Sequence, residues 1–458
     1  MSSFTSPSPG PSSSPPFSVA SPADILSYVP HALGFLPRES LVLLTMSGRR
    51  LGATLRVDLP PGAADPLAFS RGVLSFLEGD TGADGALLIV YSRQVWRPST
   101  PPPHQALISA FGAVLGSAGL TVLDGWFVSD TAWRDYFCDD QDCCSWPGRP
   151  LDAVTDSALN AELVFGGSAV DASAPAAVER QVPAVGAGSH PSPPEHAEIR
   201  SARAFFAASC RGLWTEERQF HATSALWDAV LEGTLDPDAL PEVAGFLLAS
   251  VESRTVRDFL LVGACLGSDA ALAGAMECSL LHPRAVRPDA AAERGGEDPS
   301  PSIVLPGTAP PQVLWSVGRT TAASGRTASS STNESAVAGG RDRALQFADV
   351  LAGQFTGYIM WSRVDAMSGV LGGLVAAAEG ESRAAVLTMS GWFEYARGRG
   401  SRAAVFLDAA ERAVPGYRLA RLLHELLRRG GLPEWARTRS TAWTADAATA
   451  GRQSRRAG

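Results

Sequence analysis

Two neighbouring segments near the start of the chain differ in hydrophobic pattern, and together they predict a β-hairpin. The segment SLVLLTM at 40–46 is almost wholly apolar, whereas LGATLRVD at 51–58 alternates apolar and polar residues with a period of two. A Ser-Gly pair between them favours a turn. Two later runs, ALLIVY at 86–91 and TVLDGWFV at 121–128, are typical of strands, and the first is apolar enough to be covered on both faces.

Helical patterns lie between these strands. Asp65 and Pro66 suit the N-cap and the first position of one helix, and residues 104–118 carry an apolar stripe at helical spacing. Strands and helices in the order β-β-α-β-α-β predict an α/β layered sheet domain whose strands are joined by parallel crossovers. We assign this domain to residues 21–165.

Two shorter helices are predicted at the ends of this domain. Ser21 and Pro22 suit a helix start, and this helix is expected to stop at Pro30, because proline interrupts the backbone hydrogen bonds of a helix. Residues 157–165 form the second short helical pattern. Residues 166–195 are rich in Ala, Gly, Pro and Ser and are interpreted as a linker.

The rest of the chain predicts an all-helical C-terminal half. Helical periods fall at about 196–210, 213–233, 239–250, 254–266 and 268–281, and again between about 341 and 430. We assign helical domains to 196–283 and 341–432. The Ser/Pro-rich start at 1–20, the insert at 284–340 and the tail at 433–458 contain few residues that form a core, so these segments are predicted to be disordered.

One stretch of the second helical domain resembles a tetratricopeptide unit. In a 34-residue frame beginning at Ala384, small residues fall where close helix packing needs them, at Gly391, Ala403 and Ala410, and Pro415 comes near the end. A single unit is too short for an independent solenoid, which needs about three repeats. An ordinary helical hairpin is the alternative.

Composition excludes several kinds of chemistry. All 38 basic residues are arginine, so the lysine of a phosphate-binding P-loop, of a Schiff base or of a Ser-x-x-Lys enzyme is missing. The net charge of −9 argues against nucleic acid or an anionic membrane as a partner. No run of 18 apolar residues and no secretory signal is recognised, so we expect a cytoplasmic location, where clustered cysteines are thiols or ligands rather than structural disulfides.

Three of the six cysteines form the pattern C-x4-C-C, as Cys138, Cys143 and Cys144. A structural zinc site usually needs four ligands in paired units, and two adjacent cysteines are not expected to point at one ion. An ordinary loop, a metal site and a reactive or redox thiol all remain open for these residues. No cofactor is predicted, and zinc is retained as an alternative. Cys210, Cys265 and Cys278 lie on helical patterns and are expected in the core.

Polar residues follow the ends of the predicted strands. In α/β sheets, ligands bind outside the carboxyl ends of the strands, so these residues are expected to approach one edge together with Cys138. The alternative is that these residues form no ligand site, because polar residues follow strand ends in every protein. The candidate ligand-binding residues are Asp58, Ser92, Arg93, Asp130 and Arg134.

Several of these segments resemble a known family. VPHALGFLPRESLVLL at 29–44, GATLRVDLPP at 52–61 and CDDQDCCSWPG at 138–148 are similar to an actinobacterial domain-of-unknown-function family, number 4192, and TVRDFLL at 255–261 and 400–423 resemble its later helical blocks. The opening signature is carried by Pro30, Leu33, Gly34, Phe35, Pro37, Ser40, Leu41 and Val42. The resemblance supports the architecture and implies no activity.

Three functions remain open at this stage. The absence of lysine-dependent motifs and of a catalytic triad pattern favours an interaction or scaffold protein whose helical half holds a protein partner. The first alternative is a small-ligand-binding protein or enzyme at the strand ends, in which Arg93 holds an anion, Asp58 or Asp130 acts as acid or base, and Cys138 acts as nucleophile. The second alternative is a thiol or metal sensor at the C-x4-C-C loop.

Overall fold

The chain forms two compact units, Met1–Ser173 and Ala174–Gly458. The computed structural model describes residues 19, 21–62, 64–140, 142–185, 194–281, 303–313, 333–429, 432–438 and 440–444. Most of the segments predicted to be disordered, at 1–20, 284–340 and 433–458, therefore lie outside the described residues.

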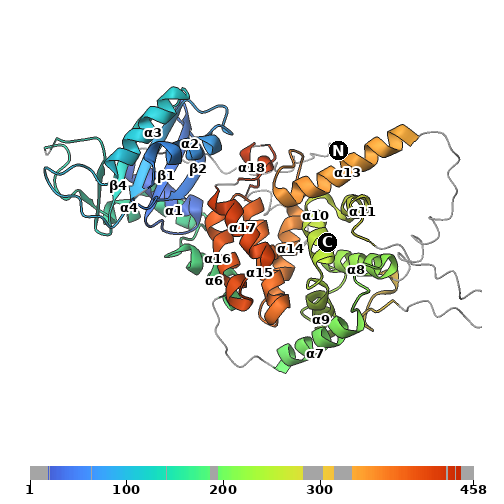
Figure 1. Cartoon of the computed structure of the whole chain (residues 1–458). Helices are drawn as coiled ribbons and strands as arrows, with labels where there is room; N and C mark the ends of the chain where they lie inside the picture. Colours follow the sequence, from blue (N-terminus) through green and yellow to red (C-terminus); the bar gives the residue numbers. More distant parts are fainter. Residues whose placement is uncertain are drawn as a thin grey trace, which may run out of the picture. The chain divides into compact units, whose positions relative to one another are not determined.

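A mixed sheet of six strands forms the centre of the first unit (Figure 1). The strands are β1 (Ser40–Ser47), β2 (Arg50–Asp58), β3 (Gly85–Tyr91), β4 (Thr121–Val128), β5 (Ala132–Asp135) and β6 (Arg149–Pro150). Their order in the sheet is β2-β1-β3-β4-β5-β6. Strands β3 and β4 pair in parallel, and the other neighbouring pairs are antiparallel.

The strand directions explain where the carboxyl ends lie. Because β1 is antiparallel to both β2 and β3, the strands β2, β3 and β4 all run in one direction. The register pairs Ser40 with Asp58 on one side and with Tyr91 on the other. The predicted parallel crossovers and the predicted β1–β2 hairpin are therefore present, but the hydrophobic pattern did not predict that β1 would lie between β2 and β3.

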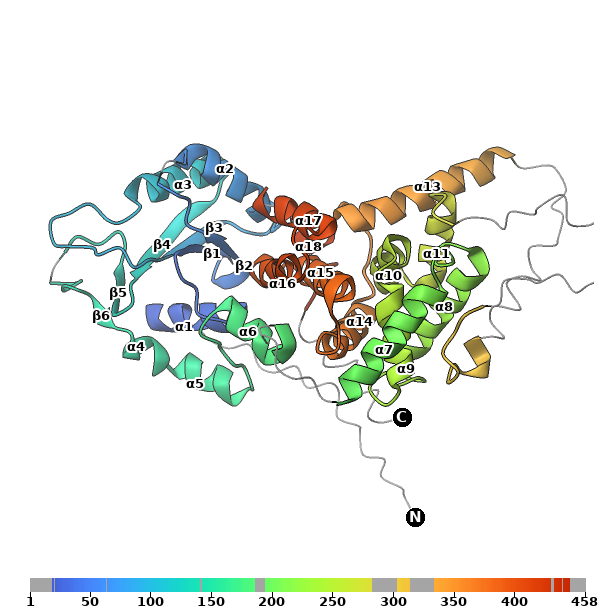
Figure 2. The ribbon, with the colours of Figure 1, turned by 60° about the horizontal axis from the view of Figure 1, so that its bottom comes forward.

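Helices cover both faces of this sheet, as Figure 2 shows. Helices α2 (Pro66–Leu77) and α3 (Gln105–Ser117) pack on one face, where Phe111 is fully buried against Leu88 and Val90. Helices α1 (Pro22–Leu33) and α4 (Asp152–Thr155) cover the other face, and α5 (Ala158–Phe165) contacts α1. The unit is an α/β layered domain, as predicted.

Helix α1 does not stop at Pro30. It continues to Leu33 and ends at Gly34, whose backbone is left-handed (φ 80°) and whose N–H donates to the Pro30 carbonyl at 2.7 Å. The predicted start is confirmed, because the Ser21 side chain accepts from the Asp24 backbone N–H in a capping box. Proline removes one hydrogen bond close to the end of the helix, and the glycine cap keeps the last turn intact.

The second unit is helical, which confirms the predicted C-terminal half. Its helices before the insert are α6 (Ala174–Gln181), α7 (Pro194–Ser209), α8 (Glu217–Leu231), α9 (Pro241–Ser250), α10 (Arg254–Leu266) and α11 (Ser268–Glu277), with a short 3-10 turn at Pro183–Val185. Those after it are α13 (Asn333–Ala352), α14 (Trp361–Leu374), α15 (Gly380–Ala396), α16 (Gly400–Ala413), α17 (Arg418–Arg428) and α18 (Glu434–Arg437).

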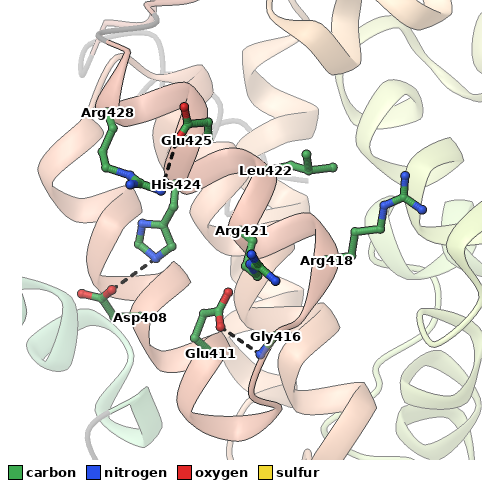
Figure 3. A pocket seen from close by; sticks show the side chains of 9 residues that line it. All are labelled: Asp408, Glu411, Gly416, Arg418, Arg421, Leu422, His424, Glu425 and Arg428. Atoms are coloured by element: carbon green, nitrogen blue, oxygen red, sulfur yellow. Dashed lines mark hydrogen bonds and ion pairs between the residues drawn. The ribbon is translucent and has the colours of Figure 1, made fainter.

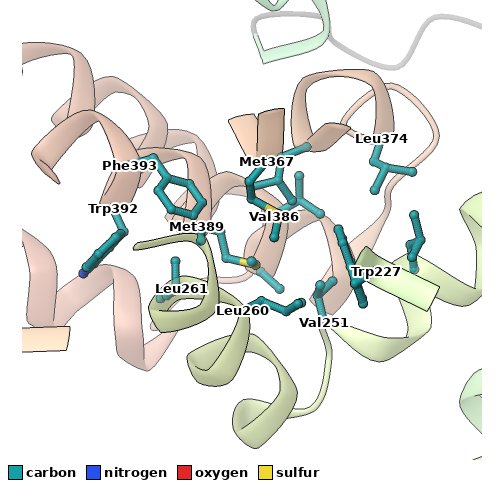
Figure 4. Close-up of a cluster of buried hydrophobic side chains, with 14 of the residues drawn as sticks. Trp227, Val251, Leu260, Leu261, Met367, Leu374, Val386, Met389, Trp392 and Phe393 are labelled. Carbon is teal, nitrogen blue, oxygen red and sulfur yellow. The ribbon is translucent and has the colours of Figure 1, made fainter. Parts of the chain in front are cut away.

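A single core joins these helices. Figure 4 shows Trp227 from α8, Leu260 from α10, Met367 from α14 and Met389 from α15 packed together. Segments on either side of the insert therefore share one apolar interior, so the two predicted helical regions form one folding unit.

Several segments are more ordered than the sequence predicted, including part of the 284–340 insert, whose Val313 is buried in the helical core. The interpreted linker at 166–195 includes helix α6, whose Val178 is fully buried in the helical core. The tail after 433 includes Trp435, which is also fully buried and donates its indole N–H to the Ala396 carbonyl at 2.8 Å. In each case a few large or branched apolar residues anchor a segment whose average composition is poor in core residues.

Candidate functional site

The carboxyl ends of β2, β3 and β4 meet at one edge of the sheet, and the expected ligand site was placed there. Asp58 ends β2, and Ser92 and Arg93 follow β3. Asp58 and Tyr91 both pair with Ser40, so they are separated by one strand, or roughly 10 Å. Asp58 is exposed and accepts from Arg56 at 2.5 Å, and Asp130 is exposed in the turn after β4.

The polar contacts at this edge centre on Glu39, which sequence reasoning missed. Its carboxylate accepts from the Ser92 hydroxyl at 3.3 Å and from the Arg93 backbone N–H at 2.7 Å. The exposed Arg93 guanidinium lies 3.5 Å away, and His104 Nε2 lies 3.4 Å from the Ser92 hydroxyl. Glu39 was missed because it precedes a strand and only residues that follow strands were considered, and His104 was missed because it was assigned to a helix.

The two residues that were missed have unusual backbones and shifted pKa values. Glu39 and His104 have positive φ angles of 43° and 62°, which non-glycine residues rarely adopt. Burial opposes ionisation of Glu39, but the Arg93 N–H, the Ser92 hydroxyl and the Arg93 charge together lower the pKa of this carboxyl. Burial lowers the pKa of His104 although the Glu39 charge opposes the shift, so the imidazole is neutral at pH 7.

Arg134 lies on β5, away from this group, and it is buried. Only 4 % of its surface is exposed, and its guanidinium carbon lies 4.6 and 3.8 Å from the ring centres of Trp96 and Trp146. Its Nη2 donates to the carbonyls of Cys138 and Cys144 at 3.2 and 3.5 Å. Nε and Nη1 find no hydrogen-bond partner among the described residues, and no carboxylate there forms an ion pair with Arg134. A buried cation without a counter-charge is costly.

The three cysteines beside Arg134 bring their sulfurs together. The Sγ atoms of Cys138, Cys143 and Cys144 all lie within 4.8 Å of one another, and those of Cys143 and Cys144 are 3.9 Å apart. Adjacent cysteines were not expected to point easily at one ion, yet the sulfurs of Cys143 and Cys144 lie close together. The Asp135 carboxylate accepts from the Cys138 backbone N–H at 3.0 Å, and Cys144 N–H donates to the Asp140 carbonyl at 2.8 Å, so the loop folds back on itself.

The thiols of this cluster affect one another. Burial, followed by hydrogen bonds and charge from Cys138 and Cys143, raises the pKa of Cys144 to about 12. A metal ion that replaces the thiol protons would offset the repulsion between the resulting thiolates. The other cysteines lie in the helical unit: Cys210 and Cys265 are buried, and Cys278 is half-buried. Burial raises the pKa of all three, to about 11 for Cys210.

A second candidate surface lies on the helical unit, between α16 and α17 (Figure 3). This groove has a volume of about 650 Å³. His424 faces Asp408 at 3.2 Å, and Glu425 pairs with Arg428 at 3.1 Å. The remaining residues that line it are Glu411, Gly416, Arg418, Arg421 and Leu422.

Comparison with known proteins gives one match. The family described as "Domain of unknown function (DUF4192)" matches residues 22–294 and 312–434, which is most of the chain. No curated protein and no solved structure matches the sequence. Among the described residues, no helix is both long enough and apolar enough to cross a membrane.

Proposed function

The chain belongs to the DUF4192 family, and we propose that this member binds a thiophilic divalent metal ion, zinc in the first instance, through Cys138, Cys143 and Cys144. The observation that carries the proposal is the convergence of three sulfurs within 4.8 Å. Its cellular setting would be the cytoplasm, where thiols stay reduced and available as ligands.

The spacing of the sulfurs fits tetrahedral thiolate coordination. With a zinc–sulfur bond of about 2.3 Å, two sulfurs of a tetrahedron lie about 3.8 Å apart. Cys143 and Cys144 are already 3.9 Å apart, so only small side-chain rotations are needed to enclose an ion. Thiolates select soft and borderline cations over Mg²⁺ or Ca²⁺, which prefer oxygen ligands.

Charge balance supports the same assignment. Three thiolates around a divalent cation carry a net charge of −1, and the buried Arg134 carries +1. Arg134 also donates to the carbonyls of Cys138 and Cys144, so it is hydrogen-bonded to the backbone of two of the three proposed ligands. Three neutral thiols would leave this guanidinium uncompensated, whereas three thiolates around a divalent ion supply the missing negative charge.

The arrangement leaves the fourth coordination position free for a ligand from solution. Among the described residues, the ligand group consists of these three cysteines. Sites with three protein ligands and one exchangeable position are typical of reactive or regulatory zinc rather than purely structural zinc. Cys143 is exposed and the other two are half-buried, so the ion would be in contact with solvent. This favours a metal or thiol sensor, in which loss of the ion releases the loop at 138–148.

Metal analysis of the reduced full-length protein tests the proposal. We expect one zinc or cadmium ion per chain, three sulfur ligands by X-ray absorption, and loss of the ion in the variant with Ser at 138, 143 and 144. Cys278→Ser is the matched control, because this half-buried cysteine lies outside the cluster. If the wild-type protein takes up no ion, or if the triple variant binds as much as the control, the proposal is wrong.

We further propose that the helical half binds an acidic protein segment in the α16–α17 groove. Arg418 and Arg421 line the groove and form no ion pair with the described residues, whereas Arg428 and His424 are paired. Leu422 is 56 % exposed beside them. Two free guanidinium groups next to an exposed leucine complement a peptide with carboxylates around an apolar side chain. The likeness of α15 and α16 to a tetratricopeptide unit stays a prediction.

A charge-reversal experiment tests this second function. We expect a Glu-rich peptide with a central leucine to bind the full chain, with an affinity that falls as salt rises. Arg418→Glu with Arg421→Glu should abolish binding. Arg254→Glu with Arg341→Glu, two exposed residues elsewhere in the helical unit, makes the same charge change and should leave binding intact. Equal binding by the two double variants would contradict the proposal.

A further inference from the structure

A second group of polar side chains, separate from the cysteines, converges where α1 and α5 meet. His31 lies in the last turn of α1, Asn160 lies in α5, and Ser168 follows α5. The Ser168 hydroxyl is 2.8 Å from His31 Nδ1, and the Asn160 Oδ1 is 2.9 Å from His31 Nε2. Ser168 and Asn160 are 137 and 129 residues away from His31, so no local motif indicates the group.

The hydrogen bonds determine which nitrogen of His31 carries the proton. The Asn160 Nδ2 donates to the Thr155 carbonyl at 2.7 Å, so the amide oxygen must be the atom that faces His31. An amide oxygen only accepts, and His31 therefore donates from Nε2. In the neutral imidazole Nδ1 then carries the lone pair, and the Ser168 hydroxyl can donate into it. A serine hydroxyl bonded to a neutral, oriented imidazole is the arrangement that activates a nucleophile.

Hydrogen bonds with neighbouring segments fix the backbone around this group. Asn160 N–H donates to the Ser157 hydroxyl, the N-cap of α5, at 3.1 Å. Beyond Ser168, Asp171 forms backbone hydrogen bonds with Gly34 at 3.1 Å and with Leu36 at 2.8 Å, which tie this segment to the end of α1. These hydrogen bonds fix the backbone near Ser168 and His31, and none of them uses the Ser168 hydroxyl.

Ser168 is accessible, and exposed apolar residues lie close to it along the chain and next to the segment that its own segment pairs with. His31, Asn160 and Ser168 are all half-buried, so small molecules can reach them. Val164 is 55 % exposed, and its carbonyl accepts from the N–H of Gly167, next to Ser168. Phe165 is 95 % exposed and Leu36 is 46 % exposed. Exposed apolar side chains of this size beside a polar group suit an acyl chain.

We propose that Ser168 is a nucleophile for acyl transfer, with His31 as its general base and Asn160 as the residue that orients the base. Ser168 Oγ attacks the carbonyl carbon of an ester with a short apolar acyl group, and its proton passes to His31 Nδ1. The alkoxide leaves with that proton, and the acyl group stays on Ser168 until water, activated by the same nitrogen, removes it as a carboxylic acid. This activity is independent of the metal proposed above.

A covalent probe tests the assignment directly. A fluorophosphonate forms a bond from phosphorus to the Ser168 oxygen, releases fluoride and leaves its mark on the intact mass and on the peptide that contains Ser168. We expect the wild-type chain to be labelled once, and Ser168→Ala to be unlabelled. His31→Ala should lower the labelling rate by about 100-fold or more. Ser117→Ala changes another exposed serine and is the matched control.

The rate of labelling tests whether Asn160 orients His31, because a residue with a purely structural role would not change this rate in a folded protein. Asn160→Ala should slow labelling. Added imidazole should restore part of the rate in His31→Ala, because the free base replaces the missing side chain. Melting curves identify any variant that fails to fold. The proposal is wrong if the folded wild-type protein is not labelled at Ser168, or if the His31 and Asn160 variants are labelled as fast as the control.

Discussion

The guanidinium carbon of Arg134 lies 3.8 Å from the ring centre of Trp146. The ring centre of Trp96 lies 4.6 Å from the same carbon, so two aromatic rings help to shield the charge from water. Each stacking contact contributes about 1–2 kcal/mol when desolvated, which offsets part of the cost of burying the group but does not neutralise it. The geometry therefore holds a positive charge beside the three sulfurs, and the proposed metal–thiolate site would supply the balancing negative charge.

Removing that charge should weaken metal binding. We expect Arg134→Met to raise the dissociation constant for zinc or cadmium about 10- to 100-fold, because attraction between charges several ångströms apart at a partly buried site is on the order of 2 kcal/mol. The metal-free protein should lose little stability, since it no longer buries an uncompensated cation. A competition titration with a chelator measures the effect. Arg93→Gln removes an exposed arginine as the control, and an unchanged affinity in Arg134→Met would contradict the charge argument.

Metal binding should also depend strongly on pH. The pKa of Cys144 is raised to about 12, so this thiol is protonated at neutral pH and must lose its proton when the metal binds. Binding therefore releases protons, and affinity should rise with pH by more than tenfold per unit between about pH 6 and pH 8. The binding enthalpy measured by calorimetry in buffers of different ionisation enthalpy gives the number of protons released. A flat profile would show that the thiols are not the ligands.

The fold was largely predictable because its signals are local. The period-two strand at β2, the apolar run at β3 and the helical stripes were each visible within a few residues, and the structure has these elements within a few residues of the predicted bounds. The position of β1 between β2 and β3 was not predictable, because the hairpin pattern fixes only the pairing of β1 with β2. Helix α6 was missed since its buried residues, such as Val178, are few and lie between Gly- and Pro-rich stretches.

The candidate sites were only partly predictable. The cysteine cluster was visible as C-x4-C-C, and Arg134 was named, but its aromatic neighbours come from separate loops. Trp96 follows β3 and Trp146 precedes β6, so their contact with Arg134 depends on the completed sheet. Ser168 and His31 meet because α1 and α5 cover the same face, a fact of topology that spacing along the chain does not contain.

Close packing of α15 on α16 leads to a prediction at Gly391. A Cβ atom there would lie 2.9 Å from Leu407 Cδ2 and 3.3 Å from the Ala403 carbonyl oxygen. Gly391→Val should therefore destabilise the helical unit by about 1–3 kcal/mol through overpacking. Gly369→Ala, in α14, is the matched comparison, because nothing lies within 4 Å of its Cβ position, and it should stabilise by about 0.5–1 kcal/mol. Urea unfolding measures both. Equal stability of the two variants would show that the helices can separate without cost.

The buried carboxylate of Glu394 gives a prediction about acid stability. Three arginines approach it: Arg402 at 3.0 Å, Arg397 at 3.2 Å and Arg399 at 3.7 Å. Burial opposes its ionisation, but the charges of these arginines together lower the pKa of Glu394 below its ordinary value. A carboxyl whose pKa is lower in the folded state contributes stability that is fully present above the unfolded pKa, about 4.3, and is lost as the pH falls through the folded value.

Replacing this residue separates its contribution from those of other carboxyls. Glu394→Gln should cost about 3 kcal/mol or more at pH 7, because three arginines are left without a central negative charge. Between pH 5 and pH 3 the variant should lose less stability than the wild type, because glutamine does not titrate. Some loss remains in both proteins, because Asp365, which pairs with Arg397 at 2.7 Å, still titrates. Glu425→Gln, an exposed glutamate paired with arginines on α17, should change stability little at either pH. Parallel stability-against-pH curves for the wild type and Glu394→Gln would show that Glu394 stays ionised over this range or contributes nothing to the network.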